Sequence, residues 1–223
     1  MSRNLTNSHI NNLWHSRQSK DPFVKNRATD GYRSRAAYKL DIIQKKHKIL
    51  RKGRVILDLG AAPGGWTQVA VKHVIDPTGP EPGRVISIDL LPILPIPNAH
   101  ILQGDMQSPE VIAKVVSVVQ GDTQTDKPVV DVVLSDMAHS FTGNRTADVA
   151  RVHDLCRTAL EVAELPQILK PGGAFVCKFL QGAGDQELRA ELLERFAKVH
   201  HEKPAASRQE SAEGFFVCTG FKR

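Results

Sequence analysis

Residues 55–70 of the chain, VILDLGAAPGGWTQVA, join a short apolar run to a glycine-rich turn and the beginning of a helix. The first three residues are typical of a buried parallel strand. Gly60, Gly64 and Gly65 would let the main chain approach a ligand at points where a Cβ atom would collide with it. The helix that follows presents its positive N-terminus to the same ligand. This segment therefore predicts a nucleotide-cofactor site in an α/β fold.

The sequence of the same turn indicates which of two kinds of cofactor is bound. The dinucleotide fingerprint G-x-G-x-x-G is absent, because the chain reads DLGAAPGGW from Asp58 to Trp66. About thirty residues later the apolar run ISID ends at Asp89, an acid placed to hold ribose hydroxyls. The combination favours S-adenosylmethionine over NAD, and a packing turn without any ligand is the less favoured alternative.

The length of 223 residues fits one α/β domain, and we expect no second domain. No apolar run approaches the roughly 20 residues that cross a bilayer, so a soluble protein without a membrane partner is expected. Cys156, Cys177 and Cys218 are odd in number and lack C-x-x-C spacing. This pattern argues against a disulfide framework and against a zinc site, and predicts reduced, buried thiols.

The positive charge of the chain is concentrated before the first predicted strand. Residues 1–54 carry 14 Lys and Arg against three Asp, a net charge of +11, whereas the remaining residues sum to −5. Such a segment is suited to grip a polyanion, and nucleic acid is the natural partner. For residues 1–20 a solvated, partly disordered tail is an equal alternative, and their acid-free composition resembles a transit-peptide remnant.

Hydrophobic periodicity and turn residues predict alternating strands and helices. The predicted helices are Arg33–Ile49, Gly65–Val74, Pro109–Val119, one from the loop His139–Thr146 to about Leu169, and Asp185–Lys198. The predicted strands are Arg54–Leu59, Arg84–Asp89, His100–Gln103, Val129–Ser135, Ala174–Phe179, and two near Val199–Lys203 and Gly214–Phe221. This alternation implies a mostly parallel, doubly wound sheet with helices on both faces.

Polar residues follow or end five of these apolar strands. Ligands of such sheets bind beyond the carboxyl ends of the strands, so these side chains are expected to share one crevice. They are Asp58, Gly60, Asp89, Asp105, Asp136 and Lys178. Lys178 lies in an otherwise apolar strand and needs a carboxylate partner, because burying an unpaired ammonium costs several kcal/mol. Asp136 is the plausible partner, Glu213 and Lys39 are candidates from elsewhere, and a purely structural ion pair is the alternative.

Four motifs together resemble the FtsJ/RrmJ family of ribosomal RNA ribose 2′-O-methyltransferases. They are GAAPGGW, SDMA, KPGGAFVCKF-x-QG, and the C-terminal KP-x-x-SR-x-x-S-x-E, and the resemblance runs from about Trp14 to Arg223. The segments KDPFVK, RSRAAYKL and KPAASRQES look most like the mitochondrial branch, which modifies a uridine of large-subunit rRNA. The resemblance implies a single Rossmann-like methyltransferase domain over residues 33–223, after a basic and partly disordered arm at 1–32.

The resemblance also implies roles for individual residues. The Lys-Asp-Lys-Glu tetrad of the family corresponds to Lys39, Asp136, Lys178 and Glu213. With the glycine-rich turn, the candidate residues for S-adenosylmethionine are Asp58, Gly60, Ala61, Pro63, Gly64, Gly65, Trp66, Asp89, Asp105, Met106 and Asp136. Asp89 would take the ribose hydroxyls and Asp105 the adenine amino group. Arg33, Arg35 and Lys39 are candidates for RNA phosphates, and no metal is implied. A monomer acting on large-subunit rRNA or a ribosomal particle, in mitochondria, is the expectation.

The chain departs from the family pattern at two places. His139 and Ser140 follow Asp136-Met137-Ala138 where the family usually has Pro-Asn, so the loop that covers the target nucleoside is expected to differ. Phe215 stands where a tyrosine is common, which removes a hydroxyl group. Tyr32 and Tyr38 are candidates for base stacking, with helix packing as the alternative, which is favoured for Tyr38.

The chemistry that fits this tetrad is transfer of the sulfonium methyl group to a ribose 2′-hydroxyl, with neutral Lys178 as general base. A cytosine-C5 enzyme would need a cysteine nucleophile after the predicted strand Val129–Ser135, and a base-amine enzyme would show N/D-P-P-F/Y there, yet the chain has neither. A methyltransferase for another RNA such as tRNA and a noncatalytic ribosome assembly factor with this fold remain the alternatives.

Overall fold

The described chain alternates between strands and helices. The strands are β1 (Val55–Leu59), β2 (Arg84–Asp89), β3 (His100–Gln103), β4 (Val130–Ser135), β5 (Leu169–Leu180), β6 (Phe196–Glu202) and β7 (Glu213–Phe221). The helices are α3 (Ala36–His47), α4 (Gly65–Val74), α5 (Pro109–Gln120), α6 (Arg145–Glu164) and α7 (Asp185–Arg195). The computed structural model describes residues 29–121, 127–208 and 211–223, so residues 1–28 of the predicted basic arm lie outside the described residues.

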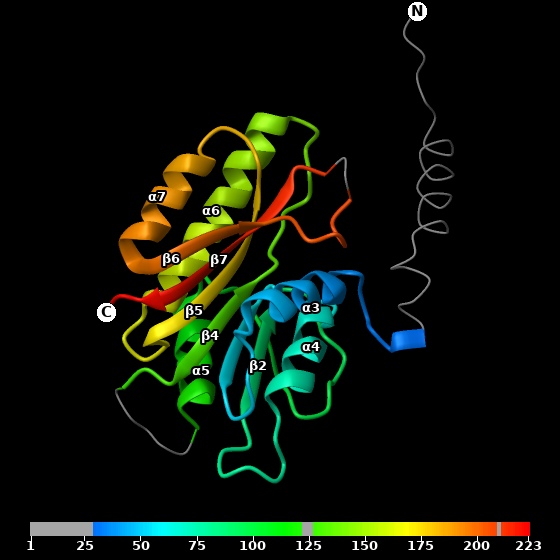
Figure 1. Cartoon of the computed structure of the whole chain (residues 1–223), viewed down its shortest axis with the longest axis vertical. Coiled ribbons are helices and arrows are strands. Elements are labelled where there is room, and N and C mark those ends of the chain that lie inside the picture. The colour runs from blue at the N-terminus through cyan, green and yellow to red at the C-terminus, as the bar shows by residue number, and fades with distance from the viewer. Residues whose placement is uncertain (1–28, 122–126, 209–210) are drawn as a thin grey trace, which may run out of the picture.

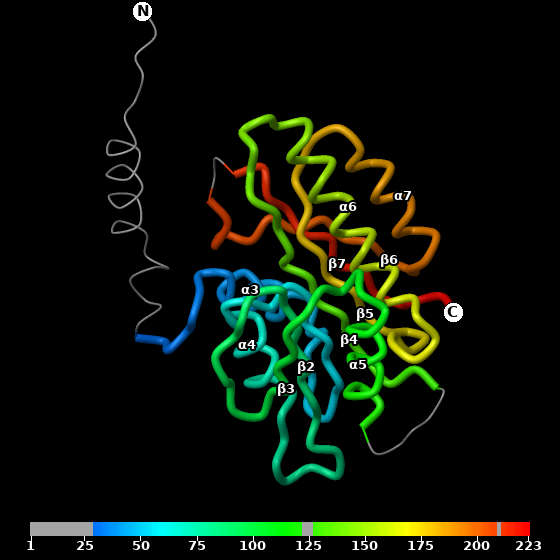
Figure 2. The backbone as a smooth tube through the Cα atoms, turned by 180° about the vertical axis from the view of Figure 1, so that it is seen from behind, coloured from blue at the N-terminus to red at the C-terminus, as the bar shows by residue number. Residues whose placement is uncertain are grey.

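The strands form one seven-stranded sheet in the order β3-β2-β1-β4-β5-β7-β6. The first five strands of that order pair in parallel, whereas β7 is antiparallel to both β5 and β6. Helices cover both faces of the sheet (Figures 1 and 2). Helices α6 and α7 lie together on one side of the sheet, and α3 and α4 lie on the other. The predicted mostly parallel α/β sheet is confirmed.

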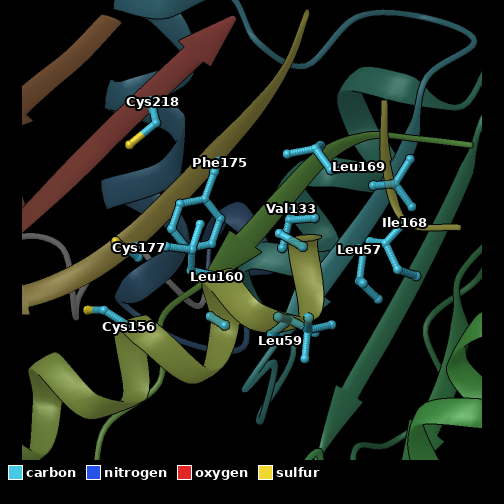
Figure 3. Close-up of a cluster of buried hydrophobic side chains, with 14 of the residues drawn as sticks. Leu57, Leu59, Val133, Cys156, Leu160, Ile168, Leu169, Phe175, Cys177 and Cys218 are labelled. Carbon is cyan, nitrogen blue, oxygen red and sulfur yellow. The ribbon is translucent and has the colours of Figure 1, made fainter. Parts of the chain in front are cut away.

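Each face of the sheet has its own hydrophobic core. Side chains of α3 and α4, including Leu40 and Val69, pack on one face. Side chains of α5, α6 and α7 pack on the other face, where Figure 3 shows Leu57, Val133, Leu160 and other members of the cluster. The three cysteines, predicted to be buried and unlinked, are free thiols within this second core. The sheet is therefore packed between helices on both faces, and this packing holds its strand ends in place.

Helix α6 ends earlier than predicted, and the cause is a proline. Pro166 forces the residue before it out of the helical region, and Leu165 accordingly has a ψ of 142°. Helix α6 therefore stops at Glu164 and not near Leu169. Leu169 pairs with Val130 at the start of β5, so the KPGG segment that predicted the helix end lies inside that strand.

Two other helices are shorter than predicted. Helix α3 covers residues 36–47 and not 33–49, because Lys48 adopts a left-handed conformation with φ 52° that ends the helix. Helix α7 ends at Arg195 and not at Lys198, because Phe196 is fully buried and pairs with Phe221 as the first residue of β6. These differences leave the order of the elements unchanged.

The register of the sheet brings the strand ends into line. Leu59 of β1 is paired with Ile88 of β2 and with Ser135 of β4, and Ser135 is paired with Cys177 of β5. Because β7 is antiparallel, its first residue, Glu213, lies at the same edge, opposite Leu180. Residues directly after these strand ends therefore meet at one edge, as the sequence predicted.

Within residues 29–121, 127–208 and 211–223, no helix is both long and apolar enough to cross a bilayer. The same residues contain no cluster of three or more His, Cys, Asp or Glu side chains arranged to hold a metal ion.

Candidate active site

A cavity of about 410 Å³ opens at the carboxyl ends of β1, β2, β3 and β4. This volume is in the range of small-ligand sites. Five of the eleven residues predicted for the cofactor line it, namely Gly60, Asp89, Asp105, Met106 and Asp136. The rest of the lining comes from Ala62, Leu90, Leu91, Gln107, Met137, Ala138, Leu155 and Thr158. The rim therefore combines three carboxylates with apolar side chains.

Two of these carboxylates are held in place by main-chain hydrogen bonds. Asp89 accepts from the main-chain N–H of Ala62 at 2.9 Å and from that of Leu91 at 2.8 Å. Asp105 accepts from the N–H of Gln107 at 2.9 Å. A carboxylate offers about four acceptor sites, so both side chains retain capacity for hydroxyl or amino donors of a ligand. Their fixed orientation fits a ligand that carries ribose hydroxyls.

The glycine turn is shaped by protein packing at all three positions where ligand approach was predicted. A Cβ atom at Gly60 would lie 2.3 Å from Cγ of Met137, and one at Gly64 would lie 2.6 Å from Cδ1 of Ile96. A Cβ atom at Gly65 would lie 2.1 Å from Oγ of Ser34. The glycines thus let the turn pack against neighbouring segments, and of the three only Gly60 lines the cavity.

Trp66, Ala61 and Pro63, also predicted for the cofactor, are not among the residues that line the cavity. Trp66 is buried, its indole N–H donates to the main-chain oxygen of Ala36 at 2.8 Å, and its ring packs 5.6 Å from that of Phe215. Ala61 and Pro63 belong to the turn but do not line the cavity. These residues therefore contribute to the shape of the turn, and they do not contact the cavity.

Asp58 is a fully buried carboxyl group within the floor of the site. Its Oδ2 accepts a hydrogen bond from Thr67 at 2.8 Å, whereas its Oδ1 has no partner. Burial is the main reason that the pKa of Asp58 is raised to about 7. The carboxylates of Asp136 and Asp89 also raise this pKa, and the Thr67 hydrogen bond lowers it. A buried acid with an orphaned oxygen, among further carboxylates, suits a ligand with positive charge.

Replacing Asp58 with asparagine is expected to change the pH dependence of stability. The pKa of Asp58 in the folded state lies above its ordinary value of 3.8, so the unfolded chain loses the proton first. Stability of the parent therefore falls as the pH rises from about 4 to about 7. Asparagine does not titrate, so the unfolding free energy of Asp58→Asn should rise relative to that of the parent as the pH increases. Between pH 5 and pH 8 this relative increase should be roughly 3 kcal/mol.

Urea denaturation of the ligand-free parent and of Asp58→Asn at the two pH values measures this difference. An equal stability difference at both pH values would contradict the assigned burial of a titrating carboxyl group.

Lys178 and Asp136 form the first ion pair of the predicted tetrad. Lys178 Nζ lies 3.1 Å from Oδ1 of Asp136 and donates a hydrogen bond to the main-chain oxygen of the same residue at 2.7 Å. The two side chains are only 10% and 16% exposed. The carbonyl takes the aligned hydrogen bond, since Oδ1 of Asp136 has no hydrogen-bond partner of good geometry. The amine is therefore held by two contacts to one residue, Asp136, which lines the cavity.

Lys39 and Glu213 form the second ion pair, with 2.7 Å between Nζ and Oε2. The other carboxylate oxygen of Glu213 accepts a hydrogen bond from the buried Ser207 hydroxyl at 2.8 Å. Phe215 pairs across the strands with Lys178, and its ring centroid lies 5.7 Å from Nζ of Lys39. Glu213 and Phe215 share a face of the sheet, because side chains alternate along a strand. Phe215 thus lies next to a lysine of each ion pair, Lys178 and Lys39.

A second, basic cavity of about 200 Å³ opens beside this pair. It is lined by Arg35, Ala36, Lys39, Ala206, Arg208, Ser211 and Glu213. Arg35 also donates from Nε and Nη2 to the main-chain oxygen of Ala206 at 2.8 and 2.6 Å, which holds the β6–β7 connection against α3. Arg208 is exposed at the cavity. Two guanidinium groups and an ammonium group thus line a cavity next to the tetrad.

Arg33 lies apart from this basic cavity. Its guanidinium donates to the main-chain oxygens of Leu94 and Pro95 at 2.5 and 2.7 Å, and also to that of Pro63 at 3.5 Å, and so ties the β2–β3 connection to the glycine turn. Tyr38 donates to Asp30 and packs edge-on against Tyr32 at 5.3 Å, which is the packing arrangement that the sequence favoured for Tyr38.

Several residues of the site were not predicted from the sequence. Leu155 and Thr158 reach the larger cavity from the middle of α6, where no local pattern distinguishes them from other helix positions. Arg208 and Ser207 belong to the β6–β7 connection. Only the SR-x-x-S-x-E motif of that segment could have indicated them.

The comparisons with known proteins agree with this geometry. The sequence matches the FtsJ-like methyltransferase family over residues 32–221. It is similar to the ribosomal RNA large subunit methyltransferase E of Rhodopseudomonas palustris (strain TIE-1), with 42% identity over 210 residues. That similarity covers 94% of this chain and 84% of the relative.

Two solved structures are similar in fold. One, from Plasmodium falciparum, is described as a ribosomal RNA methyltransferase, and it has a TM-score of 0.71 and 32% identity over 85% of this chain and 98% of that one. The other is human methyltransferase-like protein 13 in complex with SAH, with a TM-score of 0.52 and 15% identity over 82% of this chain and 81% of that one. The second likeness shows the fold alone.

Proposed function

The chain belongs to the FtsJ-like methyltransferase family, and on that premise we propose that it methylates a ribose 2′-hydroxyl of large-subunit rRNA. S-adenosylmethionine is its methyl donor. The observation that carries the proposal is the Lys178–Asp136 pair at the edge of the 410 Å³ cavity, beside the Lys39–Glu213 pair. The relatives named ribosomal RNA large subunit methyltransferase E support the RNA class.

The larger cavity supports the assignment of the cofactor site. Asp89 and Asp105, both oriented by main-chain N–H groups, would hold the ribose and adenine moieties, and the buried Asp58 lies beneath. The carboxylates of the site favour a positively charged ligand on electrostatic grounds. When bound, S-adenosylmethionine supplies an electrophilic methyl group on a sulfonium centre. Asp136 lines this cavity and also touches Lys178, so one residue connects the cofactor site to the proposed base.

The tetrad supports activation of a hydroxyl group. A ribose 2′-hydroxyl is a weak nucleophile until its proton is removed, and a positioned base contributes about 10² to 10⁴ in rate. Lys178, as the neutral amine, would accept this proton on Nζ as the hydroxyl group becomes the nucleophile. Asp136 holds the resulting ammonium ion. Lys39 and Glu213 position the acceptor ribose from the other side, and Ser207 fixes the Glu213 carboxylate.

The finer identity of the acceptor is part of the proposal. A uridine of large-subunit rRNA in mitochondria is proposed on the resemblance of the segments KDPFVK, RSRAAYKL and KPAASRQES to that branch. The protein is proposed to act as a monomer. Residues 1–54, with their net charge of +11, support an RNA acceptor.

Transfer of tritiated methyl groups to separate RNA pools tests the function. Large-subunit rRNA, large-subunit particles, small-subunit rRNA and tRNA are each incubated with the protein and labelled donor. Label is expected in large-subunit rRNA, either naked or in the particle, and in alkali-resistant dinucleotides, because 2′-O-methylation blocks cleavage of the neighbouring phosphodiester. Label confined to tRNA, or label that alkali releases in mononucleotides, would contradict the proposal.

Arg208 is expected to contact a phosphate of the acceptor RNA, since it lines the basic cavity beside Lys39 and Glu213. Replacing Arg208 with alanine should weaken RNA binding about tenfold at low salt, equivalent to about 1.4 kcal/mol. The slope of log K against log salt should also become shallower by about 0.7, as for the loss of one phosphate contact to a single strand.

Fluorescence anisotropy over a salt series measures both quantities. Lys114→Ala removes the same charge from the exposed surface of α5 and serves as the control. Equal slopes for Arg208→Ala and Lys114→Ala would show that Arg208 makes no phosphate contact.

A further inference from the structure

Phe141 is an exposed aromatic side chain in the loop that follows β4. Large hydrophobic residues with mostly exposed side chains are few in the described part of the chain, namely Leu90, Leu91, Leu94 and Phe141, and Phe141 is 63% exposed. It is the aromatic member of that group. A single exposed apolar residue needs no explanation by itself, but the contacts and the location of Phe141 set it apart.

The loop around Phe141 is fixed by one buried carboxylate. Asp148 accepts hydrogen bonds from the N–H of Thr142 at 2.9 Å, from its hydroxyl at 2.8 Å, and from the N–H of Gly143 at 3.2 Å. The Thr142 hydrogen bonds are among the causes that lower the pKa of Asp148. Asn144 caps the start of α6 by accepting from the N–H of Ala147 at 3.2 Å. Residues 142–148 therefore form a rigid base directly after Phe141.

His139 supports the same side chain from the other direction. Its ring nitrogens lie 2.7 Å from the main-chain oxygen of Ser140 and 3.1 Å from that of Asp148. The imidazole and the Phe141 ring meet edge-on, with 5.4 Å between their centroids. The two residues thus form a small aromatic surface whose orientation is set before any ligand arrives. His139 stands at one of the positions where the sequence departs from the family pattern.

This aromatic surface lies next to the proposed reaction site. Met137 and Ala138, just before His139, line the larger cavity, and Asp136 contacts Lys178. On the far side of the loop, the guanidinium of Arg145 reaches the main-chain oxygen of Gln181 at 3.4 Å, directly after β5. The loop therefore spans from the end of β4 to the end of β5, the two strands that supply the first ion pair.

We infer that Phe141, braced by His139, is a stacking platform for a nucleobase of the acceptor RNA, either of the methylated nucleotide or of its neighbour. This inference rests on the proposed function. A 2′-hydroxyl enters a pocket only if its nucleotide leaves the stack, and proteins receive such bases on aromatic rings. A phenyl ring stacks on any base, so the platform anchors the strand without reading its sequence. The rigid loop avoids the entropy cost of ordering the ring upon binding.

Replacement of Phe141 with alanine is expected to raise both the Kd and the KM for RNA by about 5- to 150-fold, the range measured for loss of one base–aromatic stack. The kcat at saturating RNA and the affinity for S-adenosylmethionine should stay unchanged, since the platform binds ground state and transition state alike. Phe141→Trp should retain RNA affinity. Phe141→Leu, which keeps an apolar side chain but lacks a π face, should resemble Phe141→Ala.

Leu94→Ala is the matched control, because Leu94 is a similarly exposed apolar residue, at 76%, on the connection between β2 and β3. RNA affinity of Phe141→Ala equal to that of Leu94→Ala and the parent would overturn the inference, as would full recovery in Phe141→Leu. If the parent methylates no RNA, the proposed function fails. If the parent methylates RNA and Phe141→Ala binds it equally well, only the platform fails.

Discussion

Replacing Lys178 with alanine is expected to lower the rate of methyl transfer by about 10² to 10⁴ while S-adenosylmethionine still binds. The amine lies 3.1 Å from Oδ1 of Asp136, which lines the cavity, and no other described lysine contacts that carboxylate. Lys178→Arg should be equally slow, because a guanidinium keeps the ion pair but cannot act as a base near neutral pH. Single-turnover rates with saturating donor and RNA separate this effect from binding.

The chain offers a close control on the same strand. Lys170 lies near the start of β5 and forms an ion pair with Asp131, also at 3.1 Å, far from the cavity. Lys170→Ala therefore removes the same charge from the same strand and should leave the rate unchanged. Transfer by Lys178→Ala at the rate of Lys170→Ala would rule out Lys178 as the general base.

Replacing Gly60 with alanine is expected to abolish cofactor binding or to prevent folding. Its φ is 69°, a region that costs an ordinary residue about 1–2 kcal/mol, and the added Cβ would lie 2.3 Å from Cγ and 3.2 Å from Cα of Met137. Relief of this clash must displace the segment of Asp136 and Met137, which lines the cavity. Loss of S-adenosylmethionine affinity by at least about 100-fold is expected, equivalent to about 2.7 kcal/mol.

Gly172→Ala is a control that introduces the same backbone strain without the clash. Its φ is 77°, but a Cβ added there meets no atom within 4 Å. Gly172→Ala should therefore cost only about 1 to 2 kcal/mol of stability and leave cofactor affinity intact. Calorimetric titration and thermal unfolding of both variants distinguish the two effects. Cofactor affinity retained in a folded Gly60→Ala protein would contradict the packing assigned to this turn.

The sheet was predictable because its strands are apolar runs that end in polar residues. Asp89 and Asp136 mark the ends of β2 and β4 in the sequence, and parallel pairing alone brings such ends to one edge. The end of α6 was mispredicted because the glycines at 172 and 173 outweighed Pro166, although the proline acts on the helix directly.

The tetrad was identified through resemblance and not through spacing. Lys39 and Glu213 are 174 residues apart, and their contact depends on α3 packing against the sheet next to β7. Local patterns also do not reveal that the indole of Trp66 contacts Ala36 or that Ser34 packs against Gly65. Residues such as Thr158 enter the site only through the placement of α6. Tertiary packing therefore decides which members of a motif face a ligand.

Nucleoside mass spectrometry tests the central claim most directly. Large-subunit rRNA or particles lacking the modification are incubated with deuteriomethyl-labelled donor and either the parent or Lys178→Ala, and the RNA is digested to nucleosides. We predict a labelled 2′-O-methylated nucleoside, proposed to be 2′-O-methyluridine, that forms with the parent and is lost with Lys178→Ala. Label on a base, or no transfer to any RNA by a protein that binds S-adenosylmethionine, would contradict the assignment of a ribose 2′-O-methyltransferase.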